Sequence, residues 1–336
     1  MDVKIAIVNS KSFGIYTDAI EKLKRLGDVI KVDVPRDIDG RKLAEVLKGI
    51  HFIVASVTPF YNREFFENNN DVVMIVRHGI GYDNIDVKAA EEHGVIVARV
   101  PGWREREAVA ELTIALMLAA LRRVVEAANS VKSGRWHERA KYVGKELSSL
   151  TVGVIGFGNI GSRVAAILAK GFNSRVFVYD PYVSRAYVER IGCIYVEKLE
   201  DLLRESDIIT LHTILTEETR HIINRKAFEE MKNGVIIVNT ARGELIDTSA
   251  LIEYIEKGKV AAVALDVVEG EPIDEKHPLQ KYPNVIITPH IGAYTYEALK
   301  GMDEAVVEAI ECYLNNKSID GVVVMPRKKR ILKTQS

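Results

Sequence analysis

The chain has 336 residues, of which 47% are hydrophobic and 28% charged, a composition typical of a well-packed globular protein. This length exceeds what one hydrophobic core usually serves, so two domains are expected. The 46 Lys and Arg nearly balance the 47 Asp and Glu, which argues against nucleic acid or an anionic membrane as the partner and favours a small substrate. The longest charge-free apolar segment, 112–121, is far shorter than the roughly 20 residues of a membrane helix.

Cysteine usage and the termini indicate the cellular compartment. Cys193 and Cys312 lie far apart and outside any metal-binding spacing, which excludes a disulfide framework and a recognisable zinc site and suits a reducing cytosol. The first residues lack the pattern of a secretion signal, so we expect a cytoplasmic protein. From the cysteine spacing we expect that the protein binds no metal. The basic run at 327–330, followed by Lys333, is expected to be a solvated tail rather than a tag for nucleic acid or a partner.

The first hundred residues alternate short apolar runs, typical of buried strands, with segments of helical periodicity. The runs are 3–8, 29–34, 52–55, 72–76 and 95–100, and the helical segments between them are 17–26, 40–47, 62–68 and 86–93. This alternation predicts a parallel sheet with helices on both faces. A longer helix is expected at 106–128. Because its middle is apolar on nearly every side, it should be buried between domains or against another subunit.

The alternation restarts after Leu150 and predicts a second, longer sheet. Its expected strands are 151–155, 175–179, 208–212, 235–239, 260–265 and 285–288. A last helix at 296–315 and an apolar run at 321–324 should cross back and complete the first domain. We therefore expect an α/β fold with two doubly wound parallel sheets, one domain formed by 1–100 with 292–336 and the other by 101–291, with a cleft between them.

A glycine motif follows the first strand of the second sheet. Gly156, Gly158 and Gly161 have the spacing GxGxxG and precede a helical run at 162–170. At such a turn the glycines let the backbone approach a pyrophosphate, which the helix N-terminus then faces. Nineteen residues past Gly161, Asp180 ends the next strand, where its carboxylate can bind both hydroxyls of a ribose and repel a 2′-phosphate. The motif predicts a Rossmann domain that prefers NAD to NADP.

Polar side chains follow three of the later strands in the second sheet. They include Arg242, Glu271 and His290. Ligands of open α/β sheets bind at the carboxyl ends of the strands, so these side chains can converge on one substrate. Taken singly, Arg242 could be a surface ion-pair partner, Glu271 a solvated loop residue and His290 a strand-end histidine. Their occurrence together behind a glycine motif favours an active site.

From about residue 76 to 298 the chain resembles the D-isomer-specific 2-hydroxyacid dehydrogenase family, which includes D-lactate dehydrogenase, glyoxylate/hydroxypyruvate reductase and 3-phosphoglycerate dehydrogenase. The resemblance rests on the segment 77–86, the glycine motif, the segments around Arg242 and Glu271, and Thr-Pro-His290, which occur in the family's order. It implies NADH as the cofactor, a small 2-oxo or 2-hydroxy acid as the substrate, a flavodoxin-like substrate domain beside the NAD-binding domain, and a homodimer built around the helix after Pro101.

The resemblance also implies roles for single residues. Arg242 would bind the substrate carboxylate and carbonyl, His290 would transfer the proton, and Glu271 would orient His290. The N–H groups of Ile80 and Gly81 would bind the carboxylate. The other implied cofactor contacts are Asn159, Ile160, His212, Thr213, Thr240, Ala241, Asp266, His290 and Gly292, and the other implied substrate contacts are Arg77, Trp103 and Tyr294.

Reduction of a 2-oxo acid gives these side chains a defined chemical task. Negative charge develops on the carbonyl oxygen as hydride arrives, and a fixed guanidinium with a protonated imidazole stabilises that charge. An ionised Glu271 favours the protonated form of His290 near neutral pH.

Two segments depart from the family's usual pattern. The stretch 101–111 is charged and one residue longer than usual, and it borders the expected cleft, so the substrate and the role of the insertion at Arg104 to Glu107 stay open. Ile214 stands where many relatives have Pro, which affects only the local loop geometry.

The sequence leaves several activities open. A lactate-like dehydrogenase is favoured mildly, with a glyoxylate/hydroxypyruvate reductase or a phosphoglycerate-type dehydrogenase as alternatives. Formate oxidation is disfavoured because family members with that activity lack the acid at the Glu271 position. An alternative of another class is an NAD-sensing binding protein similar to the transcriptional corepressors of this fold.

Overall fold

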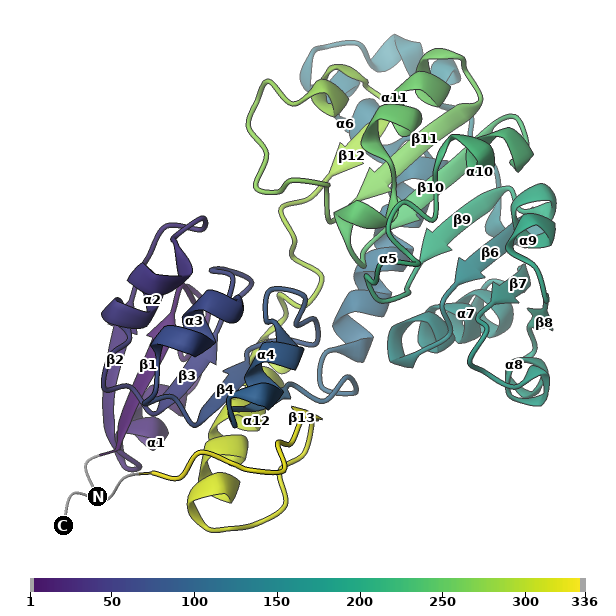
Figure 1. Ribbon diagram of the computed structural model, residues 1–336. Coiled ribbons are helices and arrows are strands. Elements are labelled where there is room, and N and C mark those ends of the chain that lie inside the picture. The colour runs from purple at the N-terminus through teal and green to yellow at the C-terminus, as the bar shows by residue number, and fades with distance from the viewer. Residues whose placement is uncertain (1–2, 333–336) are drawn as a thin grey trace. The chain divides into compact units, whose positions relative to one another are not determined.

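The computed structural model describes residues 3–332, which form two compact units (Figure 1). The first unit contains the described residues up to Glu105 and those from Tyr294 on, and the second is Arg106–Ala293. These boundaries lie slightly beyond the expected positions 100 and 291. Each unit has a sheet of its own with helices on both faces, which confirms the predicted α/β class.

The first unit contains a six-stranded sheet in the order β13-β5-β4-β3-β1-β2. Its strands are β1 (Lys4–Val8), β2 (Asp28–Val32), β3 (Phe52–Ala55), β4 (Met74–Arg77), β5 (Ile96–Arg99) and β13 (Val322–Val324). Its helices are α1 (Ala19–Lys24), α2 (Gly40–Val46), α3 (Arg63–Asn68), α4 (Val87–Glu92) and α12 (Tyr296–Leu314). β13 pairs antiparallel with β5, so the C-terminal segment does return to this unit. The five parallel strands have the flavodoxin-like order.

The second unit contains a seven-stranded parallel sheet in the order β12-β11-β10-β9-β6-β7-β8. Its strands are β6 (Thr151–Ile155), β7 (Arg175–Tyr179), β8 (Ile194–Tyr195), β9 (Ile208–Leu211), β10 (Val235–Asn239), β11 (Val260–Leu265) and β12 (Val285–Ile287). Its α-helices are α5 (Arg106–Leu121), α6 (Val124–Lys132), α7 (Asn159–Gly171), α8 (Arg185–Ile191), α9 (Leu199–Glu205), α10 (Arg225–Glu230) and α11 (Thr248–Glu256). The strand order reverses between β6 and β9, where sheets of this type bind their ligands.

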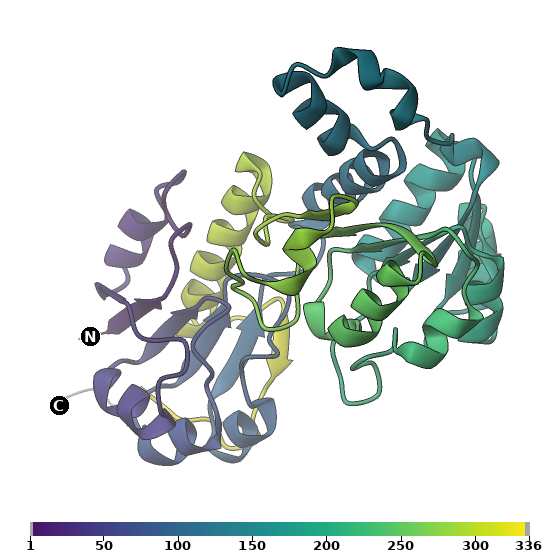
Figure 2. The same ribbon diagram turned by 90° about the horizontal axis from the view of Figure 1, so that it is seen from above.

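The expectation of one helix over 106–128 is wrong. Arg123 has a φ of 51°, and this left-handed residue separates α5 from α6. α5 buries most of its surface, whereas α6 and the 3-10 helix η1 (Trp136–Tyr142) project from the rest of the second unit (Figure 2). The large apolar side chains exposed on and beside this hairpin are Val124, Val125, Val131, Trp136 and Val143.

The central strands are apolar because helices cover both faces of each sheet, but the expectation of a buried strand at 29–34 is wrong, since β2 lies at the edge of its sheet and none of its residues is buried. Every residue of β3, β4, β9 and β10 is buried. The last residue of β10, Asn239, pairs with Leu265 of β11, which pairs with Ile287 of β12. Because these parallel strands end in register, the segments that follow them leave the sheet along one edge.

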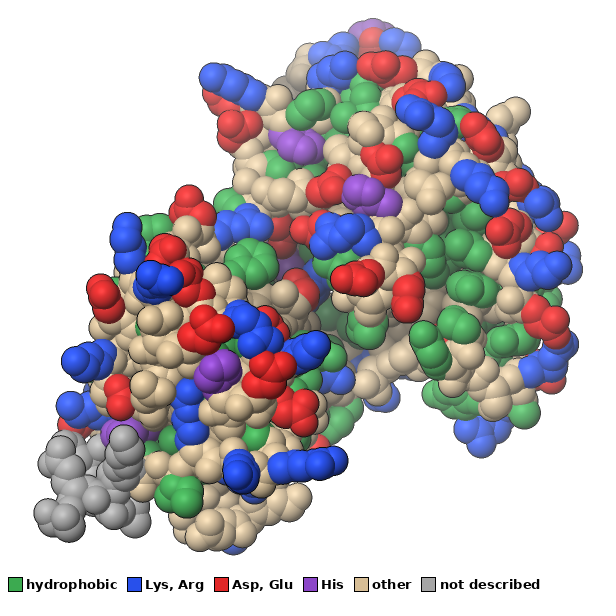
Figure 3. Space-filling view, in the orientation of Figure 1, with side chains coloured by type: hydrophobic (Ala, Val, Ile, Leu, Met, Phe, Trp, Pro, Cys, Tyr) green, Lys and Arg blue, Asp and Glu red, His purple; other side chains and the backbone are tan. Residues whose placement is uncertain are grey.

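The surface carries both signs of charge. Acidic and basic side chains are interspersed over the face shown in Figure 3. Among the residues that the structure describes, none of the helices combines the length and apolar character of a membrane span. The basic C-terminal run is not wholly solvated, because Arg330 donates hydrogen bonds to the carbonyls of Phe66, Asn69 and Val72, while Lys333 lies outside the described residues.

Candidate active site

The glycine turn between β6 and α7 presents backbone donors. α7 begins at Asn159 after Gly158, which supplies no side-chain cap, and a Cβ on Gly158 would meet nothing within 4 Å. A Cβ on Gly161 would lie 2.0 Å from the carbonyl oxygen of Gly156, so only glycine permits this close approach of helix and turn. The N–H groups of the first helical turn, which include those of Asn159, Ile160 and Gly161, have no acceptor within the helix and suit a phosphate.

Asp180 follows β7 beside the same turn. Its Oδ2 accepts a hydrogen bond from the Phe157 N–H at 2.7 Å, and its Oδ1 accepts one from the Tyr182 N–H at 2.9 Å. These bonds fix the carboxylate and leave capacity for more donors, since each carboxylate oxygen can accept two. The helix donors and the fixed acid together fit the pyrophosphate and a ribose of a dinucleotide.

His212 and Thr213 follow β9 and pack against the glycine turn. The backbone nitrogen of Thr213 lies 2.6 Å from the position that a Cβ on Gly156 would take. Nε2 of His212 lies 2.9 Å from the Thr210 hydroxyl, and burial lowers the pKa of His212 to about 3. The ring is therefore neutral at physiological pH and adds no cation to this side of the site.

Asn239 braces the turn that carries Arg242. Its Oδ1 accepts from the Ala241 N–H at 3.0 Å, and its Nδ2 donates to the Arg242 carbonyl at 2.7 Å. The Thr240 hydroxyl lies 2.8 Å from the Thr113 hydroxyl on α5, which ties the turn to that helix. Nη1 of the partly buried Arg242 donates to the Ala241 carbonyl at 2.7 Å. The turn thus holds the guanidinium at the edge of the sheet.

Asp266 follows β11 and anchors the turn that carries His290. Its Oδ1 accepts from the Thr288 hydroxyl at 2.6 Å and the Ile291 N–H at 2.9 Å, and its Oδ2 accepts from the Gly292 N–H at 2.7 Å. Burial raises the pKa of the Asp266 carboxyl, although these bonds oppose the shift. The His290 N–H donates to the Asp266 carbonyl, and these bonds together sustain a φ of 55° at His290. Contact of Asp266 with the cofactor stays a prediction.

Glu271 and His290 form a close pair at this edge. Nδ1 of His290 lies 2.5 Å from Oε1 of Glu271, whose Oε2 accepts from the Val268 N–H at 3.2 Å. Burial opposes ionisation of Glu271, but the hydrogen bond and charge of His290, with the charge of Arg242, hold the pKa of Glu271 below its ordinary value. The side chains of His290 and Glu271 remain 35% and 32% exposed, so the pair is open to a ligand.

Other predicted substrate contacts belong to the first unit. Arg77 ends β4 and is buried, and its guanidinium donates to the carbonyl of His78. Nη1 of Arg99 donates to the Ile80 carbonyl at 3.2 Å, while Gly81 is partly exposed. Arg77 and Arg99 therefore brace the glycine-rich turn from within, and the binding of a carboxylate by Ile80 and Gly81 stays a prediction.

Part of the charged insertion also pairs within the first unit. Arg104 lies over the Trp103 ring, 4.5 Å from its centroid, and bonds to Glu304 and Glu308 of α12 at 3.1 and 2.7 Å. The insertion is thus fastened to α12 by a charge cluster. Trp103 and Tyr294 are both more than half exposed, and their contact with substrate stays a prediction.

Two further pairs were not foreseen in the sequence. Nε2 of His221 lies 2.7 Å from Oε1 of Glu269, and Nε of Arg163 on α7 lies 2.6 Å from Oε2 of Glu107. Glu269 stands in the same strand-end segment as Glu271, which was a usable signal. His221 stands in the loop before α10, where no local pattern marks it.

A dinucleotide turn, an acid at the end of the next strand, and Arg, Glu and His at one sheet edge are typical of a nicotinamide-dependent oxidoreductase.

Comparison with known proteins points to the same class of enzyme. Residues 114–292 match the family model described as "D-isomer specific 2-hydroxyacid dehydrogenase, NAD binding domain". The chain is 44% identical over 271 residues to a hydroxypyruvate reductase of Thermotoga maritima, a match that covers 80% of this chain and 86% of that protein. The chain belongs to the D-isomer specific 2-hydroxyacid dehydrogenase family and carries its NAD binding domain.

Two further relatives differ in length and in name. A D-3-phosphoglycerate dehydrogenase of Methanocaldococcus jannaschii is 41% identical over 312 residues, which are 93% of this chain but 58% of that protein. This chain therefore spans little more than half of that relative. The crystal structure of a D-lactate dehydrogenase from Aquifex aeolicus, complexed with NAD and lactic acid, has a TM-score of 0.85 at 30% identity and covers 96% of this chain and 99% of that one.

Proposed function

We propose that the chain is an NAD-dependent dehydrogenase that interconverts a small 2-oxo acid and the corresponding D-2-hydroxy acid. The observation that carries the proposal is the 2.5 Å pair of His290 and Glu271 on the sheet edge that also carries Arg242. The dinucleotide bound at the glycine turn would supply or accept the hydride, and the remaining tasks fall to residues of the chain.

Arg242 and His290 would share the work at the reacting carbonyl. The guanidinium of Arg242 would bind the substrate carboxylate and the carbonyl oxygen through its fixed fork of donors. Because Nδ1 of His290 is engaged by Glu271, its other nitrogen, Nε2, would give the proton to the carbonyl oxygen during reduction and take it back during oxidation. Glu271 would hold the ring in place and stabilise its protonated form.

Asp180 would set the preference for NAD. Its carboxylate, fixed by the N–H groups of Phe157 and Tyr182, would accept hydrogen bonds from the ribose and repel a 2′-phosphate. Replacement of Asp180 with Ser should raise the KM for NADH by about tenfold, the loss expected for one hydrogen bond to a charged group, and should narrow the preference over NADPH. Equal kcat/KM of the unaltered protein with NADH and NADPH would contradict this assignment.

The substrate is best identified by direct turnover. The named relatives act on hydroxypyruvate, phosphoglycerate and lactate, so the chain length and charge of the acid are the open variables. Oxidation of NADH should be followed with glyoxylate, pyruvate, hydroxypyruvate, 3-phosphohydroxypyruvate and phenylpyruvate. Turnover of at least one acid, and its loss in Arg242→Ala, supports the dehydrogenase. Binding of NADH without turnover of any acid would support an NAD-sensing binding protein instead.

We also propose that the chain works as a homodimer in the cytoplasm. The hairpin of α6 and η1 exposes Val131 and Trp136, and an exposed apolar patch of this kind is typical of a protein interface. Both cysteines are free, which suits a reducing compartment. Light scattering should give a molar mass of two chains for the unaltered protein. The variant Val131→Asp should have the molar mass of one chain.

A further inference from the structure

The turn at 268–271 carries Glu271 to His290. The Glu271 N–H donates to the Val268 carbonyl at 3.0 Å, and Gly270 has a φ of 79°. The side chain of Glu271 returns to this turn, because its Oε2 accepts from the Val268 N–H while its Oε1 faces His290. The position of the Glu271 carboxylate therefore depends on the position of the turn.

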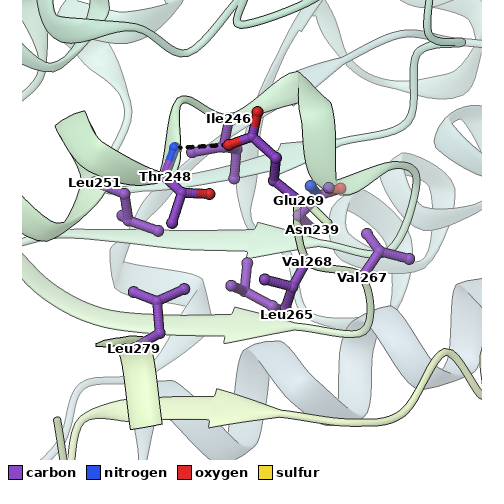
Figure 4. Close-up of a pocket in the computed structure, with 10 residues that line it drawn as sticks. Asn239, Ile246, Thr248, Leu251, Leu265, Val267, Val268, Glu269 and Leu279 are labelled. Carbon is purple, nitrogen blue, oxygen red and sulfur yellow. Dashed lines mark hydrogen bonds between the residues drawn. The ribbon is translucent and has the colours of Figure 1, made fainter. Parts of the chain in front are cut away.

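Glu269 ties the same turn to two other segments. Its Oε1 lies 2.7 Å from Nε2 of His221, in the loop between β9 and α10. Its Oε2 accepts from the Thr248 N–H at 3.4 Å, at the start of α11, and Figure 4 shows this bond. One carboxylate therefore joins three segments that are distant in sequence.

The backbone beneath the turn fits closely against it. A Cβ on Gly243 would lie 2.1 Å from the carbonyl carbon of Val268 and 2.2 Å from the nitrogen of Glu269, so the turn rests directly on the residue after Arg242. The His221 N–H donates to the Glu244 carbonyl at 2.8 Å. The loop of His221, the segment of Arg242 and the turn of Glu271 thus form one assembly.

The hydrogen bonds of Glu269 favour its ionised form. Burial opposes ionisation of Glu269, but the hydrogen bonds from His221 and Thr248 hold the pKa of Glu269 below its ordinary value. Asp247, which caps α11, also lies near His221, and the charge of that ring helps to lower the pKa of Asp247 after the hydrogen bonds of Ser249 and Ala250. The 2.7 Å contact between His221 and Glu269 thus links the loop of His221 directly to the turn.

We propose that Glu269 and His221 are positioning residues that fix the turn at 268–271 and so keep the Glu271 carboxylate on Nδ1 of His290. The proposal rests on the dehydrogenase function proposed above. Neither residue contacts the reacting atoms in this scheme. Their effect passes through Glu271, so it should disappear when Glu271 no longer carries a charge.

A double-mutant cycle tests this dependence. Glu269→Ala should move the alkaline limb of kcat/KM for 2-oxo acid reduction to lower pH by up to about one unit, the direction expected for loss of the carboxylate beside His290. In a Glu271→Gln background the same substitution should shift the limb no further. Equal shifts in both backgrounds would show a general structural effect and overturn the proposal. Glu269→Gln keeps only one of the two acceptor oxygens, so it should restore part of the profile.

The control is Glu253→Ala on α11. Glu253 pairs with Arg225 and Lys257, and its side chain is 30% exposed against 32% for Glu269, but it lies outside the assembly. Its pH profile should match that of the unaltered protein. If Glu269→Ala does not fold, His221→Gln tests the same bond from the other side and should shift the limb in the same direction.

A readout without turnover separates this proposal from the proposed function. The hydrogen bond at Nδ1 of His290, followed through the ring N–H resonance by NMR and assigned with His290→Gln, should weaken in Glu269→Ala and in Glu271→Gln. A weakened bond in a protein that reduces no 2-oxo acid supports the positioning role and contradicts the dehydrogenase. An unchanged bond in an active enzyme contradicts the positioning role alone.

Discussion

Each unit contains a histidine paired with a carboxylate, and the two pairs differ most in exposure. In the second unit His290 and Glu271 lie 2.5 Å apart with side chains 35% and 32% exposed. In the first unit Nε2 of His78 lies 2.9 Å from Oδ1 of Asp303, with side chains 3% and 1% exposed. In these two pairs the same functional groups therefore meet at a surface that a ligand can reach in one case and inside a core in the other.

Their surroundings explain the difference. Oδ2 of Asp303 accepts from the Gly14 N–H at 3.0 Å and the Thr17 hydroxyl at 2.5 Å, so the residue joins α12 to the loop after β1. The Phe13 ring packs edge-on against His78, 5.2 Å between centroids. The buried pair has no route for proton exchange with a substrate and holds segments together. The exposed pair can exchange a proton, and its contribution to folding should be small.

The largest expected effect is a loss of catalytic activity when the exposed pair is altered. His290→Ala should lower kcat/KM by more than about 100-fold in both directions, since general acid-base catalysis contributes at least that much. The thermal midpoint should change little, because the ring is partly exposed. The measurements are steady-state rates and thermal unfolding, with NADH binding as a control for the fold. A loss below tenfold would mean that another group carries the proton.

The next largest effect is a loss of stability when the buried pair is altered. Asp303→Ala removes the acceptor for Gly14 and Thr17 and the carboxylate beside His78, and it should lower the free energy of unfolding by roughly 3 kcal/mol, as expected when buried polar groups lose their partner. Its activity at a temperature where it is folded should fall far less than that of His290→Ala. Denaturant titration measures the stability. A stability equal to that of the unaltered protein would show that the buried site relaxes without cost.

A smaller effect concerns pH and the exposed pair. Reduction needs His290 protonated, and the charge of Glu271 stabilises that form. Glu271→Gln keeps the shape but removes the charge, so the alkaline fall in kcat/KM for reduction should move to lower pH by about one unit or more. Oxidation needs the neutral ring and should keep its activity to lower pH. A reductive profile superimposed on that of the unaltered protein would mean that Glu271 does not act on His290.

The exposed pair could be predicted from the sequence, and the buried pair could not. Glu271 and His290 follow strands that helices cover on both faces, so apolar runs mark the strands and polar residues mark their ends. Asp303 instead lies within α12 and binds residues almost three hundred positions earlier. A lone acid in a helix resembles a solvated residue, and only the folded chain shows what it contacts.

The same distinction explains the errors in the fold. The break at Arg123 has no Gly or Pro to mark it, and bonds from that side chain to Glu126 and to the Lys141 carbonyl accompany the left-handed conformation. β8 has two residues, too few for a periodic pattern. Arg330 is held by backbone carbonyls far away in sequence, which a local basic run cannot reveal. Local patterns thus predicted most of the strands and the helices of the first unit, whereas the side-chain contacts of Arg123 and Arg330 had to come from the structure.

The smallest effect concerns pH and the buried pair. Burial lowers the pKa of His78, although the contact with Asp303 opposes the shift. In the unfolded chain a histidine titrates near pH 6.5, so below this pH the unfolded chain binds more protons than the folded one. Above it both states are neutral and the residue contributes no pH dependence. Stability should therefore fall as the pH is lowered below about 6.5, by at most about 1.36 kcal/mol per pH unit for one proton.

His78→Gln removes this titrating group and keeps an amide near Asp303, so its stability should fall less steeply between pH 7 and pH 5. Part of the slope should persist, because burial also lowers the pKa of His212, to about 3, and that ring contributes in the same direction. Denaturant titrations at pH 5, 6 and 7 measure both slopes. Parallel slopes would mean that His78 binds protons equally in the folded and unfolded chains. The difference in exposure would then not separate the two pairs, because the buried histidine would titrate as freely as an exposed one.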